Sequence, residues 1–584
     1  MNPATDHARA LVAALVRLGL EHVVVCPGSR SAPLAYALYD AARGGRPTLH
    51  VRHDERVAGF TALGIGKSTG RPAAVVTTSG TAVVNLHPAV LEAHHAGVPL
   101  LVLAADRPRR LRGSWANQTS DLQPEAFGRA TRCAADLSSD ADAATWEAAA
   151  VVAFGAAVGE TGGRPGPVLL NLSFEDPLVP DGAEPWRPED TSGPSEASWS
   201  SVAAAPPAGR AVAGPASVEA AALSMLERAR TRRTVVVAGD GAGAQARRLA
   251  AHVGLPLLAE PTSGARGGPN LVAAYRILLE HPELGGQVEH VIALGRPTLS
   301  RPVTRLLARP EVTVDLVLAH PDDPRTDRSD VMVIDAAVVD AALEIPPAAD
   351  DRAAEWSSTW RRAGSLAAVA VDRVLDGWPV LTGPLVAREV AAATGPADAL
   401  VLAASNPVRD ADLAGSGWDL PPYVVANRGV SGIDGTISTA VGVALGRGRA
   451  STTRVLVGDV ALLHDLGALV LGPDERRPDL TVVVVNDAGG GIFSLLEPGR
   501  DGERDARSAA RFERMFGTPH SVRLAEVCAG LGVRHASVAS TAGLRERLAT
   551  EPRGLSVLEV SVDRADLRPL HEAIRNAVTA ALSH

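Results

Sequence analysis

The hydrophobic positions of the chain follow one repeating pattern. Short, continuous apolar runs alternate with longer stretches in which apolar residues recur at helical spacing. Continuous runs of this kind are typical of strands that are buried on both faces of a parallel sheet. The sequence therefore predicts an α/β protein of mostly parallel sheets flanked by helices. The expected strands are residues 22–26, 48–51, 167–172, 290–295, 399–405, 454–457 and 481–485.

Two stretches interrupt this pattern and predict linkers. Residues 181–217 are rich in Pro, Ser, Gly and Ala without a sustained period, and residues 345–351 read IPPAADD. At 584 residues the chain is too long for a single core. We therefore expect three domains, each built on one mostly parallel sheet: an N-terminal domain at 1–185, a linker and central domain at 186–350, and a C-terminal domain at 351–584.

Composition and charge narrow the class of protein. The net charge of −9 argues against nucleic-acid binding, which needs a basic face. No apolar run approaches the roughly 18 residues of a membrane span, and the helical pattern at 7–20, which carries Arg9 and Arg17, lacks the apolar core of a signal peptide. Three cysteines without a CxxC pair favour a reducing compartment. We therefore expect a soluble cytoplasmic protein, and we attribute its single lysine, Lys67, to a G+C-rich genome.

The stretch 458–493 carries the most informative chemistry. One strand ends in a Gly-Asp turn at Asp459, a helical pattern follows at 464–471, and the next strand ends in an Asn-Asp turn at Asp487 before three glycines. Two strands joined by a helix form a βαβ unit, which places both acidic turns at the carboxyl edge, where open parallel sheets bind ligands. The two carboxylates would then share one hard divalent cation, and the glycines would let the backbone approach phosphate groups. Either turn alone is better explained as an ordinary acidic turn, so the interpretation depends on the pair.

Three turns in the N-terminal segment offer further polar groups at strand ends. The strand at 22–26 runs into PGSRS, a tight turn that opens a helix and forms a natural anion site, to which Arg30 would add a guanidinium. Glu55 lies at the start of an apolar helix shortly after the strand at 48–51, and a TTSGT turn occupies 77–81. A plain helix cap at PGSRS and a helix-dipole partner at Glu55 are alternatives that the residues alone leave open.

Several of these motifs occur in the order found in one enzyme family. PGSRSAPL, HDER, TSGTAV, ADRP and ANQ follow one another between about residues 20 and 130, and NRG, SGIDG and the paired acidic turns lie between about 400 and 500. Together they resemble the 2-succinyl-5-enolpyruvyl-6-hydroxy-3-cyclohexene-1-carboxylate synthase (MenD) branch of the thiamine-diphosphate-dependent enzymes. TSGTA-type turns occur across that superfamily, whereas PGSRS with HDER and ANQ is much more specific. The resemblance implies a pyrimidine-binding N-terminal domain and a diphosphate-binding C-terminal domain of the thiamine-diphosphate-binding fold, with a Rossmann-like domain between them.

The resemblance implies thiamine diphosphate and Mg²⁺ as cofactors, with Mn²⁺ as an alternative metal. It gives Glu55 the catalytic role of bonding to N1′ of the aminopyrimidine and driving its tautomerisation. It gives Asp459, Asp487 and the carbonyl of Gly489 as metal ligands, although the family usually has Asn in place of Asp487. Ile433 would hold the cofactor bent. The other implied cofactor contacts are Pro27, Thr78, Gly80, Ser431, Gly432, Val460, Ala461, Gly490, Ile492 and Phe493.

The implied reaction joins 2-oxoglutarate to isochorismate in menaquinone biosynthesis. The transferase would decarboxylate 2-oxoglutarate and add the resulting succinyl-semialdehyde carbanion to isochorismate by 1,4-addition. Substrates with several carboxylates need arginine and amide side chains. After the strand at 290–295, Arg296 and Arg305 are as arguable as Arg301, because Pro302 replaces a second basic residue of the family. The implied substrate contacts are Ser29, Arg30, Arg107, Asn117, Gln118, Arg301, Ser405, Arg409 and Arg428.

The family assembles as dimers or tetramers, so the resemblance implies a homodimer or homotetramer with active sites at the subunit interface. Three other functions remain open. Another thiamine-diphosphate 2-oxoacid decarboxylase or acetolactate-type synthase would keep Glu55 and the acidic turns without needing the arginines. A non-catalytic nucleotide-binding regulator or a nicotinamide oxidoreductase would use GDGAGA at 239–244. We interpret this segment as a degenerate Rossmann-like turn without a bound nucleotide, because it lacks the G-x-G-x-x-G spacing.

Overall fold

The computed structural model of the protein describes residues 2–160, 162–182, 186–190, 215–323, 325–347, 351–415 and 417–583. Residues 183–185 and 191–214 of the first expected linker and 348–350 of the second lie outside these ranges. The chain forms two compact units. The first unit comprises Met1–Arg210, Asn427–Ala450 and His464–Leu480, and the second comprises Ala211–Ala426, Ser451–Leu463 and Thr481–His584.

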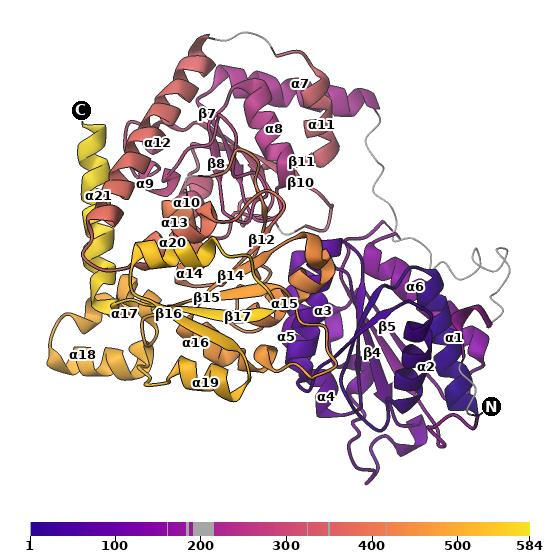
Figure 1. Ribbon diagram of the computed structural model, residues 1–584. Helices are drawn as coiled ribbons and strands as arrows, with labels where there is room; N and C mark the ends of the chain where they lie inside the picture. The colour runs from indigo at the N-terminus through magenta and orange to yellow at the C-terminus, as the bar shows by residue number, and fades with distance from the viewer. Residues whose placement is uncertain are drawn as a thin grey trace. The chain divides into compact units, whose positions relative to one another are not determined.

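The first unit is built on a parallel sheet of six strands: β1 (His22–Val25), β2 (Thr48–Val51), β3 (Ala73–Thr77), β4 (Leu100–Asp106), β5 (Cys133–Leu137) and β6 (Pro167–Ser173). Their order across the sheet is β2-β1-β3-β4-β6-β5. Helices α1 (Pro3–Arg17), α2 (Ala32–Arg43) and α6 (Ala143–Val158) cover one face, and α3 (Glu55–Thr69), α5 (His87–Ala96) and α15 (Thr436–Arg447) lie on the other (Figure 1). Every residue of β3, β4 and β6 is buried, as expected for strands covered on both faces.

The central sheet belongs to the second unit. Its parallel strands are β7 (Thr234–Ala238), β8 (Leu257–Ala259), β9 (His290–Leu294), β10 (Thr313–Leu318) and β11 (Met332–Asp335), in the order β11-β10-β9-β7-β8. Helices α7 (Pro215–Thr231), α8 (Gly243–Val253) and α11 (Ala336–Glu344) cover one face (Figure 1). Helices α9 (Tyr275–Leu278), α10 (Arg301–Ala308) and α12 (Asp351–Gly377) contribute to the core on the other.

The C-terminal sheet also belongs to the second unit. Its strands are β12 (Ala399–Leu402), β13 (Tyr423–Val425), β14 (Thr453–Gly458), β15 (Leu480–Asn486), β16 (Arg534–Val538) and β17 (Leu555–Ser561), in the order β13-β12-β14-β15-β17-β16. Helices α13 (Gly383–Ala392), α14 (Asn406–Ala414), α20 (Thr541–Leu548) and α21 (Leu567–Leu582) pack on one of its faces.

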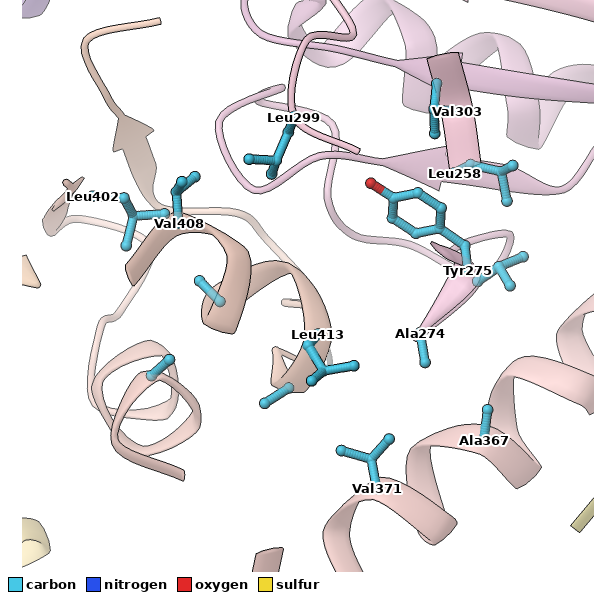
Figure 2. Packing of buried hydrophobic residues seen from close by; sticks show 14 of the residues in the cluster. Leu258, Ala274, Tyr275, Leu299, Val303, Ala367, Val371, Leu402, Val408 and Leu413 are labelled. Carbon is cyan, nitrogen blue, oxygen red and sulfur yellow. The ribbon is translucent and has the colours of Figure 1, made fainter. Parts of the chain in front are cut away.

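One apolar core runs between the central and the C-terminal sheets. Figure 2 shows Leu258, Tyr275 and Leu299 of the central part in the same cluster as Val408 and Leu413 of α14. Leu299 comes from the segment that follows β9, and Val408 comes from the helix that follows β12. The shared core therefore fixes these two candidate substrate-binding segments within one unit.

The predicted α/β class with parallel sheets is confirmed, and each expected strand is present within a few residues. One sheet falls within each expected domain range, while the domain boundaries stay a prediction. The helix expected at 464–471 is misplaced: α16 (Asp459–His464) begins at the acidic turn itself, and a 3₁₀ turn (Leu466–Leu469) lies within the expected range. α16 ends at His464 because the buried carboxylate of Asp465 accepts two hydrogen bonds from Ser438, and the Asp465 backbone leaves the helical conformation at φ −122°. None of the described helices is both long and apolar enough to cross a membrane.

In each sheet the chain reverses its direction across the sheet after the second strand. The chain moves from β1 to β2 on one side and returns to β3 on the other, and the same holds for β7, β8 and β9 and for β12, β13 and β14. Such a switch point leaves a crevice at the carboxyl ends of the two middle strands, where open α/β sheets bind ligands. The crevices lie between β1 and β3, between β7 and β9, and between β12 and β14.

Candidate active site

Two turns meet at the switch point of the first sheet. The PGSRS turn joins β1 to α2, and a Cβ on Gly28 would lie 2.3 Å from the Cβ of Thr78, which follows β3. Only glycine allows this close approach. Ser31 donates from Oγ to the carbonyl oxygen of Gly28 at 3.0 Å. Pro27 and Ser29 are exposed on this turn, whereas Thr78 is buried. The structure therefore brings these three candidate contacts to one place.

The guanidinium of Arg30 is tied to the segment that follows β6. It is buried, its Nη1 donates to the carbonyl oxygen of Phe174 at 3.0 Å, and it lies 3.4 Å from Oδ2 of Asp176. Arg30 thus holds the PGSRS turn against the end of the sheet. Its contact with substrate stays a prediction.

The loop after β4 gathers three candidate substrate contacts. Arg107 donates from Nε to the carbonyl oxygen of Asn117 at 2.9 Å and from Nη2 to Oδ1 of the same residue at 2.5 Å. The carbonyl oxygen of Gln118 accepts from Oγ of Ser79 at 2.6 Å. A Cβ on Gly80 would lie 3.3 Å from Cγ of Gln118. Arg107, Asn117 and Gln118 therefore form one cluster that is anchored on the turn after β3.

A buried polar network, which the sequence analysis does not identify, holds this loop. Gln123 accepts from the N–H of Gly80 at 2.8 Å and donates to Oδ1 of Asn171 at 2.8 Å. Asn171 donates to Asp106 at 2.9 Å, and Arg112 forms an ion pair with Asp106 at 2.9 Å. These residues come from separate segments, so no local pattern in the sequence groups them.

Glu55 is the first residue of α3. Asp54 caps this helix by accepting from the backbone N–H groups of Arg56 at 2.8 Å and Val57 at 3.2 Å. Glu55 is half-buried, and burial raises the pKa of its carboxyl. Burial, and after it the charge of the nearby Glu55, raises the pKa of the Cys26 thiol to about 12. A carboxyl with a raised pKa at a sheet edge is suited to exchanging a proton near neutral pH.

The loop 427–435 is fixed by a buried ion pair. Glu92 of α5 accepts from the N–H groups of Gly429 at 2.9 Å and Val430 at 2.8 Å, and lies 3.3 Å from Nζ of Lys67 on α3. The side chains of Glu92 and Lys67 are 1% and 8% exposed. The sequence analysis gives neither of them a role. The loop carries the candidate contacts Arg428, Ser431, Gly432 and Ile433.

In the second unit, the two acidic turns lie at the carboxyl ends of the neighbouring strands β14 and β15. Asp459 is 2% exposed and Asp487 is half-buried. Burial raises the pKa of both carboxyls, and the charge of Asp459 contributes to raising the pKa of Asp487 to about 7. A bound cation would relieve this repulsion. No group of three His, Cys, Asp or Glu side chains in the described ranges could hold a metal, so a third protein ligand would come from the backbone.

The glycines after Asp487 are required by close packing. A Cβ on Gly491 would lie 1.8 Å from Oδ2 of Asp487, and one on Gly489 would lie 2.2 Å from the carbonyl oxygen of Gly517. The N–H of Gly489 donates to Oδ1 of Asp487 at 3.2 Å. These contacts define the backbone path of the turn and make the Gly489 carbonyl a fixed candidate ligand.

The remaining candidate substrate and cofactor contacts of the second unit lie at the start of α14, at the start of α10, and in or after the acidic turns. Nη1 of Arg409 donates to the carbonyl oxygen of Ser405 at 2.7 Å, so these two residues lie together at the start of α14. Arg301 is exposed at the first residue of α10, and its place in a substrate site stays a prediction. Phe493 packs against Phe516 with ring centroids 5.6 Å apart. The acidic turns and the residues directly after them contain Val460, Ala461, Gly490 and Ile492.

The glycine-rich turn at 239–244 is filled by the protein itself. Asp240 and Arg296 exchange two backbone hydrogen bonds, of 3.0 and 2.9 Å. A Cβ on Gly239 would lie 2.1 Å from the backbone nitrogen of Pro297. The segment after β9 thus occupies the place where a dinucleotide phosphate would approach this turn. This packing argues against a nicotinamide oxidoreductase and against a nucleotide-binding regulator.

Comparison with known proteins identifies the family. The family model described as "Thiamine pyrophosphate enzyme, N-terminal TPP binding domain" matches residues 5–126. A 2-succinyl-5-enolpyruvyl-6-hydroxy-3-cyclohexene-1-carboxylate synthase from Kineococcus radiotolerans is 49% identical over 597 aligned residues, covering 100% of both chains. Proteins of the same name from Nocardioides sp. and Renibacterium salmoninarum are 47% and 46% identical, covering 98% and 99% of this chain and 97% and 98% of theirs. This chain belongs to that synthase family.

Membership of the synthase family confirms the resemblance and the prediction of a thiamine-diphosphate-dependent transferase. It favours the main interpretation over the decarboxylase and regulator alternatives. The matched thiamine-binding region contains the PGSRS turn, Glu55 and the turn after β3. The divalent metal and the roles of individual residues stay predictions.

The residues of this synthase-family chain fit a magnesium-bound diphosphate. Two carboxylates and a fixed backbone carbonyl supply the oxygen ligands that Mg²⁺ prefers. Apart from Gly458 and its two chain neighbours, no described atom lies within 4 Å of the position that a Cβ on Gly458 would take, so this strand end faces open space. A cavity of about 680 Å³ also borders the second turn and is lined by Asp487, Ser494 and Arg564.

Proposed function

We propose that the protein decarboxylates 2-oxoglutarate and joins the remaining succinyl unit to isochorismate by 1,4-addition, as a step of menaquinone biosynthesis. The observation that carries this proposal is a pair of carboxylates, the buried Asp459 and the half-buried Asp487, at the open carboxyl edge of a sheet. The full-length relatives named as 2-succinyl-5-enolpyruvyl-6-hydroxy-3-cyclohexene-1-carboxylate synthases support the choice of substrates.

Several residues would bind the cofactor or exchange a proton with it. When bound, thiamine diphosphate supplies the electron sink for decarboxylation and carbon–carbon bond formation. Asp459, Asp487 and the carbonyl of Gly489 would hold Mg²⁺. Glu55 would hold and exchange the proton at N1′, for which its raised pKa suits it. Ile433 would support the cofactor from the loop 427–435.

The candidate arginines suit substrates that carry several carboxylates. Arg107 lies with Asn117 in the first unit, and Arg409 lies with Ser405 in the second. Arg428 is buried in the loop 427–435. Guanidinium groups bind carboxylates through paired, charge-assisted hydrogen bonds. A decarboxylase without an anionic acceptor would not need this set, which favours the synthase. Ser29, Arg30, Gln118 and Arg301 belong to the same proposed substrate site.

We further propose a homodimer or homotetramer in which Glu55 of one chain reaches the cofactor held by Asp459 and Asp487 of another. A cytoplasmic location is part of the same proposal. It is supported by the three cysteines, all of which are free thiols in the structure.

The proposal is tested by the dependence of turnover on isochorismate. The purified protein is given thiamine diphosphate, Mg²⁺ and 2-oxoglutarate, with and without isochorismate, and CO₂ and organic products are measured. We expect fast CO₂ release and a coupled product only when both substrates are present. Release of succinic semialdehyde at the full rate without isochorismate would instead identify a decarboxylase.

The same assay tests the role of Glu55. Glu55→Gln keeps the size of the side chain but removes the exchangeable proton, so turnover should fall about 10²–10⁴-fold while fold and cofactor affinity are retained. Glu21→Gln is the matched control, because Glu21 forms an ion pair with Arg46 at 3.6 Å in the same unit. Unchanged turnover in Glu55→Gln would remove Glu55 from the mechanism.

A further inference from the structure

A histidine outside the predicted site contacts the first acidic turn. Nε2 of His520 lies 2.7 Å from Oδ2 of Asp459, and the two side chains are 16% and 3% exposed. His520 follows the short helical turn Glu513–Gly517 and belongs to the second unit, as Asp459 does. The contact joins residues 61 positions apart in the sequence.

The second nitrogen of the ring indicates which way this hydrogen bond runs. The backbone N–H of Val522 donates to Nδ1 of His520 at 3.3 Å. Because a backbone N–H is only a donor, Nδ1 must be the acceptor, and the neutral ring then carries its proton on Nε2. His520 therefore donates to Oδ2 of Asp459. This bond fixes the orientation of the carboxylate and leaves lone pairs on Oδ1 for a cation.

The same segment also contacts the second acidic turn. The N–H of His520 donates to the carbonyl oxygen of Ala488 at 3.3 Å, and the N–H of Gly490 donates to the carbonyl oxygen of Gly517 at 2.7 Å. Nη1 of Arg564 donates to the same Gly517 oxygen at 2.9 Å. The segment ending at His520 therefore touches the turns after β14 and after β15 at once.

We infer that His520 is a positioning residue for the metal site, which orients Asp459 and couples the two acidic turns so that both offer oxygens to one cation. The inference rests on the proposed function, because it requires Mg²⁺ between these turns. A ligand that is already held in its binding orientation loses less conformational freedom when the metal arrives. Outer partners of metal ligands are typically worth about 10–100-fold in metal affinity.

The test compares two substitutions that differ in one hydrogen bond. The amide nitrogen of Gln lies close to the position of Nε2 in His, so His520→Gln can still donate to Asp459, whereas His520→Ala cannot. Mg²⁺ is titrated calorimetrically into each protein in the presence of a fixed excess of thiamine diphosphate, and the heat of Mg²⁺ binding to the free cofactor is subtracted. We expect His520→Ala to bind Mg²⁺ about 10–100-fold more weakly than the wild type. His520→Gln should stay within about threefold of the wild type.

His290→Ala is the matched control for loss of stability alone. His290 lies 3.1 Å from Oδ2 of Asp315 in the central sheet, and both side chains are fully buried. Its removal should lower the unfolding temperature and leave Mg²⁺ affinity unchanged. Equal Mg²⁺ affinity in His520→Ala and the wild type, or an equal loss in His290→Ala, would overturn the role of His520. A wild type that binds no Mg²⁺ with thiamine diphosphate would overturn the proposed function as well.

Discussion

The central and C-terminal sheets of the second unit share the order of their first four strands but differ at the crevice beside the first strand. In both, the chain leaves the first strand for one side of the sheet and returns on the other. In the central sheet, Gly295 follows β9, and a Cβ there would lie 2.6 Å from the backbone nitrogen of Ala242. In the C-terminal sheet, β14 ends at Gly458, where no described atom beyond the glycine and its chain neighbours lies within 4 Å of a Cβ position. One crevice is closed by backbone, and the other is open.

The difference arises from the residues that follow each strand. Asp240 and Arg296 pair through their main chains, which satisfies backbone donors and acceptors within the protein. Asp459, which is buried, and Asp487, which is half-buried, instead place two carboxylates at the edge of the sheet, where desolvation raises the pKa of each. Such a pair is destabilising unless a cation neutralises it. The shared topology predicts where a crevice lies, and the residues around it determine whether a ligand can enter.

The largest effect that this comparison predicts is the loss of cofactor binding in Asp459→Ala. The substitution removes one of two side-chain ligands, so Mg²⁺-dependent binding of thiamine diphosphate should weaken more than about 100-fold, beyond the loss typical of an outer partner. The metal-free variant should unfold at a temperature no lower than the wild type, because burial disfavours the charge of Asp459. Calorimetry and thermal unfolding measure the two quantities.

Asp240→Ala is the matched control at the closed crevice. Its main-chain hydrogen bonds with Arg296 do not depend on the side chain. Binding of thiamine diphosphate should therefore be unchanged. If Asp240→Ala weakened cofactor binding as much as Asp459→Ala, the contrast between the two crevices would be wrong.

A smaller effect should distinguish Gly295, which follows β9, from Gly458, which is the last residue of β14. Gly295 has φ +68°, and its Cβ position is close to backbone atoms, so Gly295→Ala should lower the free energy of unfolding by about 1–3 kcal/mol. Gly458→Ala meets no such obstacle and should unfold like the wild type. Its methyl group would instead enter the open crevice and weaken cofactor binding, by about tenfold if the clash costs about 1.4 kcal/mol. Urea unfolding and calorimetry would show each variant changed in one property only. Equal stability losses in both variants would contradict an open crevice at Gly458.

The sequence predicts the sheets well because their strands are locally encoded. Continuous apolar runs place β14 and β15 to within one residue at each end, and the short strand expected at 48–51 is β2 with the same bounds. The helix between β14 and β15 is misplaced by several residues because its end depends on a distant partner. Asp465 bonds to Ser438, 27 positions earlier in the chain, and no local pattern records that contact.

The same distinction applies to the candidate site. Asp459 and Asp487 could be predicted, because both stand directly after recognisable strands at the spacing of a βαβ unit. Glu92 and His520 could not, because each is defined by a contact with a remote segment. Glu92 meets Gly429 across 337 positions, and its partner Lys67 stands out in the sequence only as the single lysine. Residues that position other residues are therefore visible mainly in the folded structure.

The smallest effect concerns the pH dependence of stability at the open crevice. The pKa of Asp487 is raised from 3.8 to about 7, by burial first and then by the charge of Asp459. Between these two values the unfolded chain releases this proton while the folded protein keeps it. The contribution of Asp487 to stability is therefore full below pH 3.8 and is lost as the pH rises through about 7. Asp487→Asn removes the proton exchange while keeping the shape of the side chain. Without metal, this variant should unfold on the order of 2 °C above the wild type at pH 8, and the gap should shrink towards pH 5. A gap that stays constant over this range would mean that neither burial nor the charge of Asp459 raises the pKa of Asp487, and the C-terminal crevice would then be no more strained than the central one.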